Sequence, residues 1–196
     1  MLKKNKISKL AGFFYEVGHL RKIPRAHMQA LFTSDLSDNI ASHSFRVSII
    51  GWFLAQEEKA DPYKVTLMYL LHDTGETRSG DQNWIHKRYV KVFEDEINKD
   101  QFKDLPHNKE LFDLVKEYEE KKSLESKIAK DADLLDQILL LREYSLQGNI
   151  EAKSWMTTKD DRIKRLSTKS AKKLCREIYK QDPSDWWKDI WTSKRR

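Results

Sequence analysis

Cysteine, glycine and proline are all scarce in this sequence. One cysteine, six glycines and four prolines are spread over 196 residues. The single cysteine, Cys175, cannot form a disulfide within the chain, which excludes a disulfide-stabilised scaffold and favours a reducing, cytoplasmic location. Because glycine and proline are the residues that interrupt helices, their scarcity leaves long stretches open to helix formation.

Long apolar runs are missing as well. The longest one, residues 48–55, is interrupted by Gly51 and is far shorter than the roughly 18 residues that a transmembrane helix requires. We therefore expect no membrane partner. The basic start, residues 1–6, is followed by no apolar segment, so we also expect no signal peptide.

Charge is abundant but evenly spread. Charged residues make up 35% of the chain, and 37 basic against 31 acidic residues give a net charge of +6. No basic run alternates with aromatic residues, so the pattern favours a solvated surface and no stable nucleic-acid complex. Hydrophobic residues at 39% supply a core for one domain of ordinary size.

Apolar residues recur with helical spacing along almost the whole chain, and alternating strand patterns are hard to find. We predict an all-α fold with a single domain over residues 1–196. Its core should span about residues 7–150, with C-terminal helices at about 157–193 packed on it. The predicted helices cover about residues 7–20, 40–59, 62–75, 84–98, 109–121, 124–147, 159–180 and 186–191.

The C-terminal segment 182–191 contains three tryptophans, Trp186, Trp187 and Trp191. Tryptophans that lie this close together are more often part of a core than of a ligand platform. We predict that they form a lid on the domain. A contact in a homodimer is the alternative.

Polar side chains lie on the apolar faces of three predicted helices. His43, His72 and Asp131 each share a helical face with aliphatic neighbours, and Asp73 follows His72 directly. A lone buried histidine is commonly an ordinary core residue, but a buried carboxylate requires a partner. Two histidines and two acids in one helical core predict a divalent metal site, with ligands that converge from separate helices.

The order His43, His72-Asp73, Asp131 resembles the H…HD…D signature of the HD-domain metal-dependent phosphohydrolases. The resemblance covers about residues 7–180 and points to the branch of bacterial 5′-deoxynucleotidases and their eukaryotic HD-domain-containing relatives. The stretches that carry it are residues 21–25, 40–47, 70–76, 79–81 and 129–134.

This resemblance implies a helical bundle with one divalent metal ion (Mn, Co, Mg, Fe, Ni or Zn) in its core. The implied metal ligands are His43, His72, Asp73 and Asp131. Glu76 matches the acid that orients or deprotonates the attacking water. Asp81 matches an acid that assists this proton transfer or binds the sugar, and Arg25 matches a residue that clamps the substrate phosphate.

The implied enzyme is a 5′-nucleotidase-like phosphomonoesterase. It would hydrolyse (deoxy)ribonucleoside 5′-monophosphates to nucleoside and phosphate by attack of a metal-bound water. Ala26 follows Arg25 where some members carry a bulky aromatic residue that excludes a 2′-hydroxyl, so the sugar preference stays open. The partner is a nucleotide, and a homodimer is compatible with the sequence.

Two other functions stay open. His86 and His107 lie between the HD pair and the final acid, as in members that bind a second metal and act as phosphodiesterases or nucleases. A non-catalytic nucleotide-binding protein on the same fold is the other alternative. Asp133 and Asp136 are predicted to be acids of a helix surface, and Lys130 is predicted to be solvated.

Overall fold

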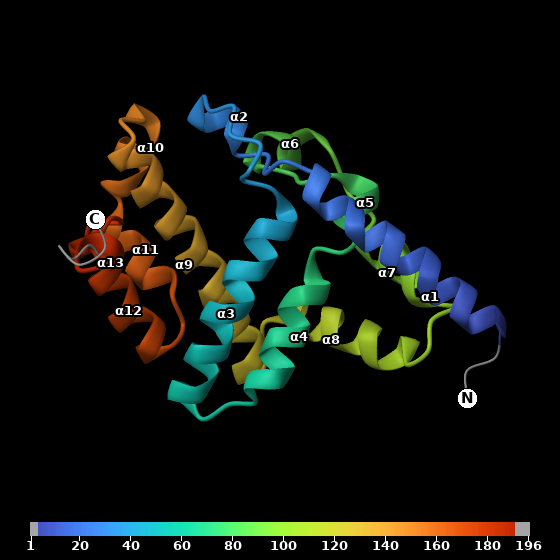
Figure 1. The fold of residues 1–196 in the computed structure, drawn as a ribbon. Coiled ribbons are helices and arrows are strands. Elements are labelled where there is room, and N and C mark those ends of the chain that lie inside the picture. Colours follow the sequence, from blue (N-terminus) through green and yellow to red (C-terminus); the bar gives the residue numbers. More distant parts are fainter. Residues whose placement is uncertain (1–3, 191–196) are drawn as a thin grey trace.

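The computed structural model describes residues 4–190, and every regular element in this range is a helix (Figure 1). The all-α prediction is confirmed. The helices are α1 (Lys4–Val17), the 3-10 helix η1 (Gly18–Lys22), α2 (Met28–Leu31), α3 (Ile40–Glu58), α4 (Pro62–His72), α5 (Glu76–Ser79), α6 (Trp84–Tyr89), α7 (Glu94–Phe102), α8 (Asn108–Glu120), α9 (Leu124–Leu146), α10 (Ile150–Met156), α11 (Lys159–Arg165), α12 (Lys169–Lys180) and α13 (Asp185–Lys188). None of these helices is long and apolar enough to cross a membrane.

Capping residues decide where the main helices begin. The side chain of Asp61 accepts hydrogen bonds from the backbone N–H groups of Tyr63 and Lys64, with Pro62 in the first turn of α4. Asn39 caps α3 and Ser123 caps α9 in the same way. These short polar side chains satisfy N–H groups that have no partner inside the helix.

The long helix α9 is the centre of the domain. It packs against α3, α4, α8, α10 and α12, which surround it. In Figure 1, α3 and α4 fill the middle of the view, with α1 and α7 on one side and α9 to α13 on the other. Because neighbours cover α9 on several sides, its buried residues are not confined to one stripe.

The close approach of α3 and α4 depends on Gly51. A Cβ atom at this position would lie 3.0 Å from the Cγ1 of Val65 on α4 and 3.8 Å from the Cβ of Ala132 on α9. This spacing is tighter than ordinary van der Waals contact. Gly51 therefore allows the three helices that carry the site described below to pack against one another.

Three helix predictions are wrong in their extent. The predicted helix 84–98 is divided into α6 and α7, and 159–180 is divided into α11 and α12, where Thr168 caps α12. Helix α10 lies in a segment for which no helix is predicted. The helix predicted over 62–75 ends at His72, because the backbone of Asp73 leaves the helical region (φ −96°, ψ 6°).

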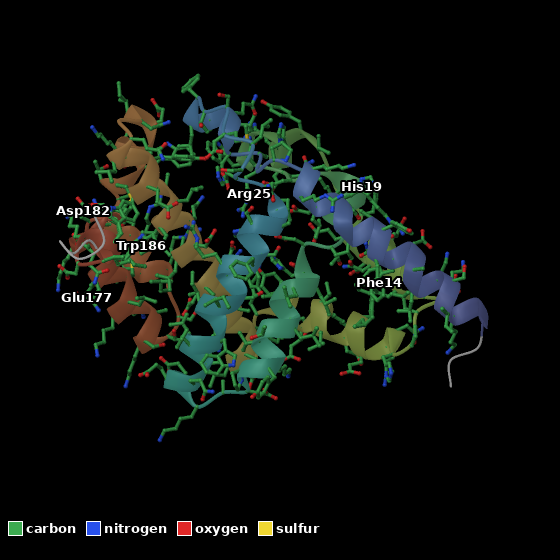
Figure 2. The ribbon with its side chains drawn as sticks, in the orientation of Figure 1. Phe14, His19, Arg25, Glu177, Asp182 and Trp186 are labelled. Atoms are coloured by element: carbon green, nitrogen blue, oxygen red, sulfur yellow. The ribbon has the colours of Figure 1, made fainter. Side chains whose placement is uncertain are left out.

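The tryptophans at the C-terminus do not form a buried lid. Trp186 is 72% exposed and Trp187 is 43% exposed, and their rings contact each other edge to face with centroids 4.9 Å apart. Figure 2 shows Trp186 among the C-terminal helices, away from Arg25 near the start of α3. The lid prediction is wrong for these two residues, and Trp191 lies outside the described residues.

Candidate metal centre and substrate pocket

The C-terminal end of α4 and the start of α3 bring three predicted ligands together. One ligand atom each of His43, His72 and Asp73 lies within 4.8 Å of the other two. His43 comes from the first turns of α3, while His72 is the last residue of α4. Because α4 ends there, the adjacent side chains of His72 and Asp73 both turn toward His43.

A fourth residue, the second acid, joins this cluster from α9. An Oδ1 of Asp133 lies 3.4 Å from the Nε2 of His43, and an Oδ2 of Asp73 lies 3.8 Å from the same atom. Asp133 is only 21% exposed through its side chain. The prediction that it is an acid of a solvated helix surface is therefore wrong.

Asp131, the predicted fourth ligand, faces away from the cluster. Its carboxylate accepts hydrogen bonds from the backbone N–H groups of Ser167 and Thr168, both at 2.8 Å, and from the Thr168 hydroxyl at 2.7 Å. It holds the residue that caps α12. The placement predicted for Asp131 is wrong, because a central helix buries more than one face and the apolar spacing does not say which neighbour each face meets.

Asp136 is the second acid of α9 that turns toward the cluster rather than toward solvent. The Nδ1 of His43 donates a hydrogen bond to Oδ2 of Asp136 at 2.6 Å. The available sequence signal is spacing, since Asp133 and Asp136 are three residues apart and share one helical face.

Both imidazoles present their Nε2 atoms to the cluster. While His43 uses Nδ1 for Asp136, His72 donates from Nδ1 to the backbone carbonyl of Tyr69 at 2.6 Å. Histidines that bind metals are commonly oriented through the other ring nitrogen in this way. The Tyr69 hydroxyl lies within hydrogen-bond distance of the Nε2 of His43, at 3.0 Å.

The pKa shifts show that the cluster favours positive charge. Burial alone would raise the pKa values of Asp73 and Asp133, but His72 beside Asp73 and Lys130 beside Asp133 hold both below their usual range. Burial opposes a charged His43, yet its hydrogen bonds to Asp133 and Asp136 raise the pKa of His43 to about 9. Two imidazole nitrogens and two ionised carboxylates form a donor set that suits a divalent cation.

The cluster forms one wall of a pocket of about 460 Å³. This volume is in the range of small-molecule sites, about 300–1,000 Å³. Arg25, Glu76 and Asp81, the other predicted site residues, all line the same pocket. Lys130 lines it too, with its Nζ 2.5 Å from Oδ2 of Asp133, and its side chain is 46% exposed, as predicted for a solvated lysine.

Asp81 holds Arg25 at the wall of the pocket. Oδ2 of Asp81 accepts a hydrogen bond from the backbone N–H of Ala26 at 2.6 Å and lies 3.4 Å from the Nε of Arg25. Burial would lower the pKa of Arg25, but Asp81, Asp133 and Asp73 raise it above its usual value. The guanidinium therefore stays charged although its side chain is only 13% exposed.

Glu76 is the acid of the pocket that lacks a partner. It begins α5, and its buried Oε2 has no hydrogen-bond partner among residues 4–190. Burial raises the pKa of Glu76 to about 10, and the nearby carboxylates of Asp73 and Asp81 add to this shift. A cation in the neighbouring cluster would reverse the effect, since it would stabilise the ionised form of Glu76.

His86 and His107 do not join the cluster. The side chain of His107 is 79% exposed at the start of α8, and neither histidine lines the pocket. Within the described part of the chain, one group of three such side chains lies close enough to hold a metal ion, and it is the group of His43, His72 and Asp73. The geometry thus gives no support to a second metal at His86 or His107.

A helical bundle whose histidine and aspartate side chains converge from three helices is the arrangement that the sequence motif implies for HD-domain phosphohydrolases. The family model described as HD domain matches residues 17–175, which is most of the chain. The chain therefore belongs to the HD domain family, and the resemblance found in the sequence is confirmed.

Curated relatives of this chain carry the name 5′-deoxynucleotidase HDDC2. The protein from Dictyostelium discoideum is 29% identical over 126 residues, which cover 58% of this chain and 66% of the relative. The human protein is 27% identical over 140 residues, which cover 69% of this chain and 68% of the relative. The chain thus spans about two thirds of the length of these relatives.

Solved structures share the fold. A conserved hypothetical protein from Pyrococcus furiosus has a TM-score of 0.72 at 24% identity, covering 87% of this chain and 99% of its own. A structure titled a predicted metal-dependent phosphohydrolase, from Magnetospirillum magnetotacticum MS-1, has a TM-score of 0.66 at 20% identity. The match covers 90% of this chain and 95% of that structure's chain. At these identities the likeness shows the fold alone.

Proposed function

We propose that this protein is a metal-dependent phosphomonoesterase that hydrolyses nucleoside 5′-monophosphates to nucleoside and inorganic phosphate, with deoxynucleotides as the preferred class. One observation carries this proposal: a cluster of two histidines and two aspartates lies in the same pocket as a buried arginine and an unpaired glutamate. The name of the curated relatives supports the substrate class.

The proposed metal ligands are His43, His72, Asp73 and Asp133. Their donor atoms suit a divalent cation. His43, His72 and Asp73 each offer one ligand atom within 4.8 Å of the other two, Oδ1 of Asp133 lies 3.4 Å from the Nε2 of His43, and both Nδ1 atoms are held by other hydrogen bonds. When bound, such a cation supplies Lewis-acid chemistry, polarising a phosphoryl oxygen and lowering the pKa of water.

Arg25 is the proposed phosphate-binding residue. Its guanidinium lies in the pocket wall, stays charged, and offers a planar set of donors that matches two phosphate oxygens. Asp81 keeps the Arg25 segment in place through the Ala26 N–H. This contact favours a positioning role for Asp81 over the proton transfer that the motif also allowed.

Glu76 is the proposed proton acceptor. Its free carboxylate oxygen can accept a hydrogen bond from a water molecule that attacks the phosphorus, and then the proton of that water. A phosphate bound by Arg25 and a water held by Glu76 would meet within the same pocket. Fixing both reactants in this way removes much of the entropic barrier to the reaction.

Phosphate release from a nucleotide panel tests the function. We expect release from 5′-monophosphates, fastest from deoxynucleotides, when Mn²⁺, Co²⁺ and Mg²⁺ are compared, and much slower release from 5′-triphosphates. Faster degradation of single-stranded DNA or RNA than of any mononucleotide would overturn the proposal in favour of a nuclease. Bound metal without phosphate release from any member of the panel would favour a nucleotide-binding protein.

Metal removal is expected to lower the thermal stability. A cation that binds the folded cluster but not the unfolded chain contributes about 2.7 kcal/mol at a concentration a hundredfold above its Kd. For a domain of this size, that corresponds to a decrease in Tm of about 5–10 °C on addition of excess EDTA. Scanning calorimetry before and after chelation, with the metal content measured in parallel, checks this. An unchanged Tm after confirmed metal loss would contradict the site.

Glu76 should also leave a pH signature in the metal-free protein. Its pKa in the folded chain, about 10, lies above the ordinary value of 4.5, so ionisation of this carboxyl opposes folding. The destabilisation is absent below about pH 4.5 and grows as the pH rises toward 10, because the folded state then holds a proton that the unfolded state has lost.

Glu76→Gln removes this ionisable group. We expect the variant to be more stable than the parent protein in EDTA, with a difference that grows between pH 6 and pH 9 by up to about 1.4 kcal/mol per pH unit. Urea titrations at several pH values measure it. The exposed acid Glu57 on α3 gives a matched control, since Glu57→Gln should show no such slope. A difference for Glu76→Gln that does not change with pH would contradict the burial argument.

A further inference from the structure

A chain of polar contacts leads from the cluster to the surface between α3 and α9. Behind His43, the Oδ2 of Asp136 accepts the Nδ1–H at 2.6 Å, and Asp136 in turn binds Arg46, which lies one helical turn after His43. The Nη1 of Arg46 also donates a hydrogen bond to the Oε1 of Glu143 at 2.7 Å. Asp136 and Glu143 are two turns apart on α9, so Arg46 spans both.

The two oxygens of Asp136 have different partners. Oδ1 accepts from the Nε of Arg46, while Oδ2 accepts from His43. Arg46 also donates from Nη2 to the backbone carbonyl of Asp136 at 3.4 Å. Because Asp136 is only 4% exposed, water does not compete freely for these contacts, and the carboxylate cannot rotate without losing Arg46.

We propose that Arg46 is a positioning residue for the metal site. It fixes Asp136 so that one oxygen always faces His43, and this oxygen keeps the proton of the imidazole on Nδ1. Nε2, the atom that faces Asp73 and Asp133, is then free to bind a metal. The inference rests on the metal site of the proposed function and adds a determinant of its affinity.

The substitution Asp136→Asn tests this mechanism, because Arg46 determines how the new amide is oriented. Arg46 only donates, so the amide oxygen of Asp136→Asn must face Arg46 and the NH₂ group must face His43. The amide then donates to Nδ1, and the imidazole proton moves to Nε2, where it blocks the metal. We expect the Kd for Mn²⁺ to rise by about 10–100-fold.

Removing Arg46 as well should restore part of the affinity. In the double variant Arg46→Met/Asp136→Asn the amide can turn, so that its oxygen faces His43 again. We expect the double variant to bind Mn²⁺ at least about threefold more tightly than Asp136→Asn alone. A purely structural role for Arg46 predicts the reverse, since the second substitution would then only add to the loss.

Calorimetric titration of the metal-free proteins with Mn²⁺ is the measurement, with circular dichroism to confirm folding. Glu143→Gln is the matched control, because it leaves the contact between Arg46 and Asp136 in place and should bind as the parent does. A parent protein that binds no divalent ion would overturn the proposed function itself. A parent that binds, with Asp136→Asn equal to it or the double variant weaker than Asp136→Asn, would overturn only the role of Arg46.

Arg46→Met alone keeps the inference testable if Asp136→Asn does not fold. The Arg46 side chain is 33% exposed, so its loss is easier to tolerate than a change at buried Asp136. Without the guanidinium, Asp136 can rotate away from His43, and we expect a Kd for Mn²⁺ several-fold above that of the parent. An unchanged Kd would overturn the inference.

Discussion

Asp133→Asn is expected to abolish tight metal binding, while Asp131→Asn is expected to leave it intact. Asp133 is the acid of α9 that faces His43. Replacing its carboxylate by the neutral amide of asparagine removes one of the two carboxylates that would hold a cation. Asp131 lies on another face of α9, where it binds Ser167 and Thr168. Metal content and the Kd for Mn²⁺ measure the difference.

The two variants should also differ in stability. Asp131→Asn weakens the bonds that cap α12, so the free energy of unfolding in EDTA should fall by about 1–3 kcal/mol. Asp133→Asn should also be less stable than the parent in EDTA, because its ionised carboxylate binds Lys130 and His43 in the folded state, and it should in addition lose the stabilisation that metal gives the parent. A folded Asp131→Asn protein that binds no metal, or an Asp133→Asn protein with the Mn²⁺ affinity of the parent, would indicate that Asp131 is the fourth metal ligand instead of Asp133.

Glu76→Gln is expected to lower kcat by about 10²–10⁴ while metal binding is retained. The amide keeps the size of the side chain but cannot accept the proton of the attacking water. Phosphate release from a deoxynucleoside 5′-monophosphate gives the rate, and metal analysis shows that the cluster is filled. The variant should thus be less active with metal and more stable without it.

A matched substitution shows whether the loss of kcat is specific to Glu76 or follows from removing any glutamate. Glu57→Gln, at an exposed position of α3, should have the kcat of the parent. If Glu76→Gln keeps nearly full activity, the water is activated without Glu76, and Asp81 becomes the next acid to test. If Glu76→Gln loses its metal, the residue acts on the cluster rather than on the water.

Local signals in the sequence were sufficient to predict the helices that carry the site. Asp61-Pro62 marks the start of α4, and the two histidines lie on apolar faces that the structure buries. The predicted helix 62–75 ends three residues early, at His72, and this earlier end lets the side chains of His72 and Asp73 both turn inward. Such features depend on residues close in sequence, so they can be predicted without knowledge of the packing.

The acids of α9 could not be assigned in this way. Asp131, Asp133 and Asp136 lie within two turns of one helix, and the helical period gives the face of each but not the neighbour that covers it. Since α9 packs against five other helices, Asp131 is buried against the start of α12 while Asp133 is turned toward α3 and α4. The contact between Arg46 and Asp136 spans 90 residues and leaves no local signal.

The sequence by itself therefore determined the all-α class, the HD motif, and three of the four proposed ligands: His43, His72 and Asp73. Only the tertiary structure placed Asp133 in position to be the fourth proposed ligand, and only it showed that Arg46 binds Asp136, the partner of His43. The physical reason is that hydrophobic periodicity places a side chain on a face of its helix, whereas its partner depends on how separate helices pack around that face.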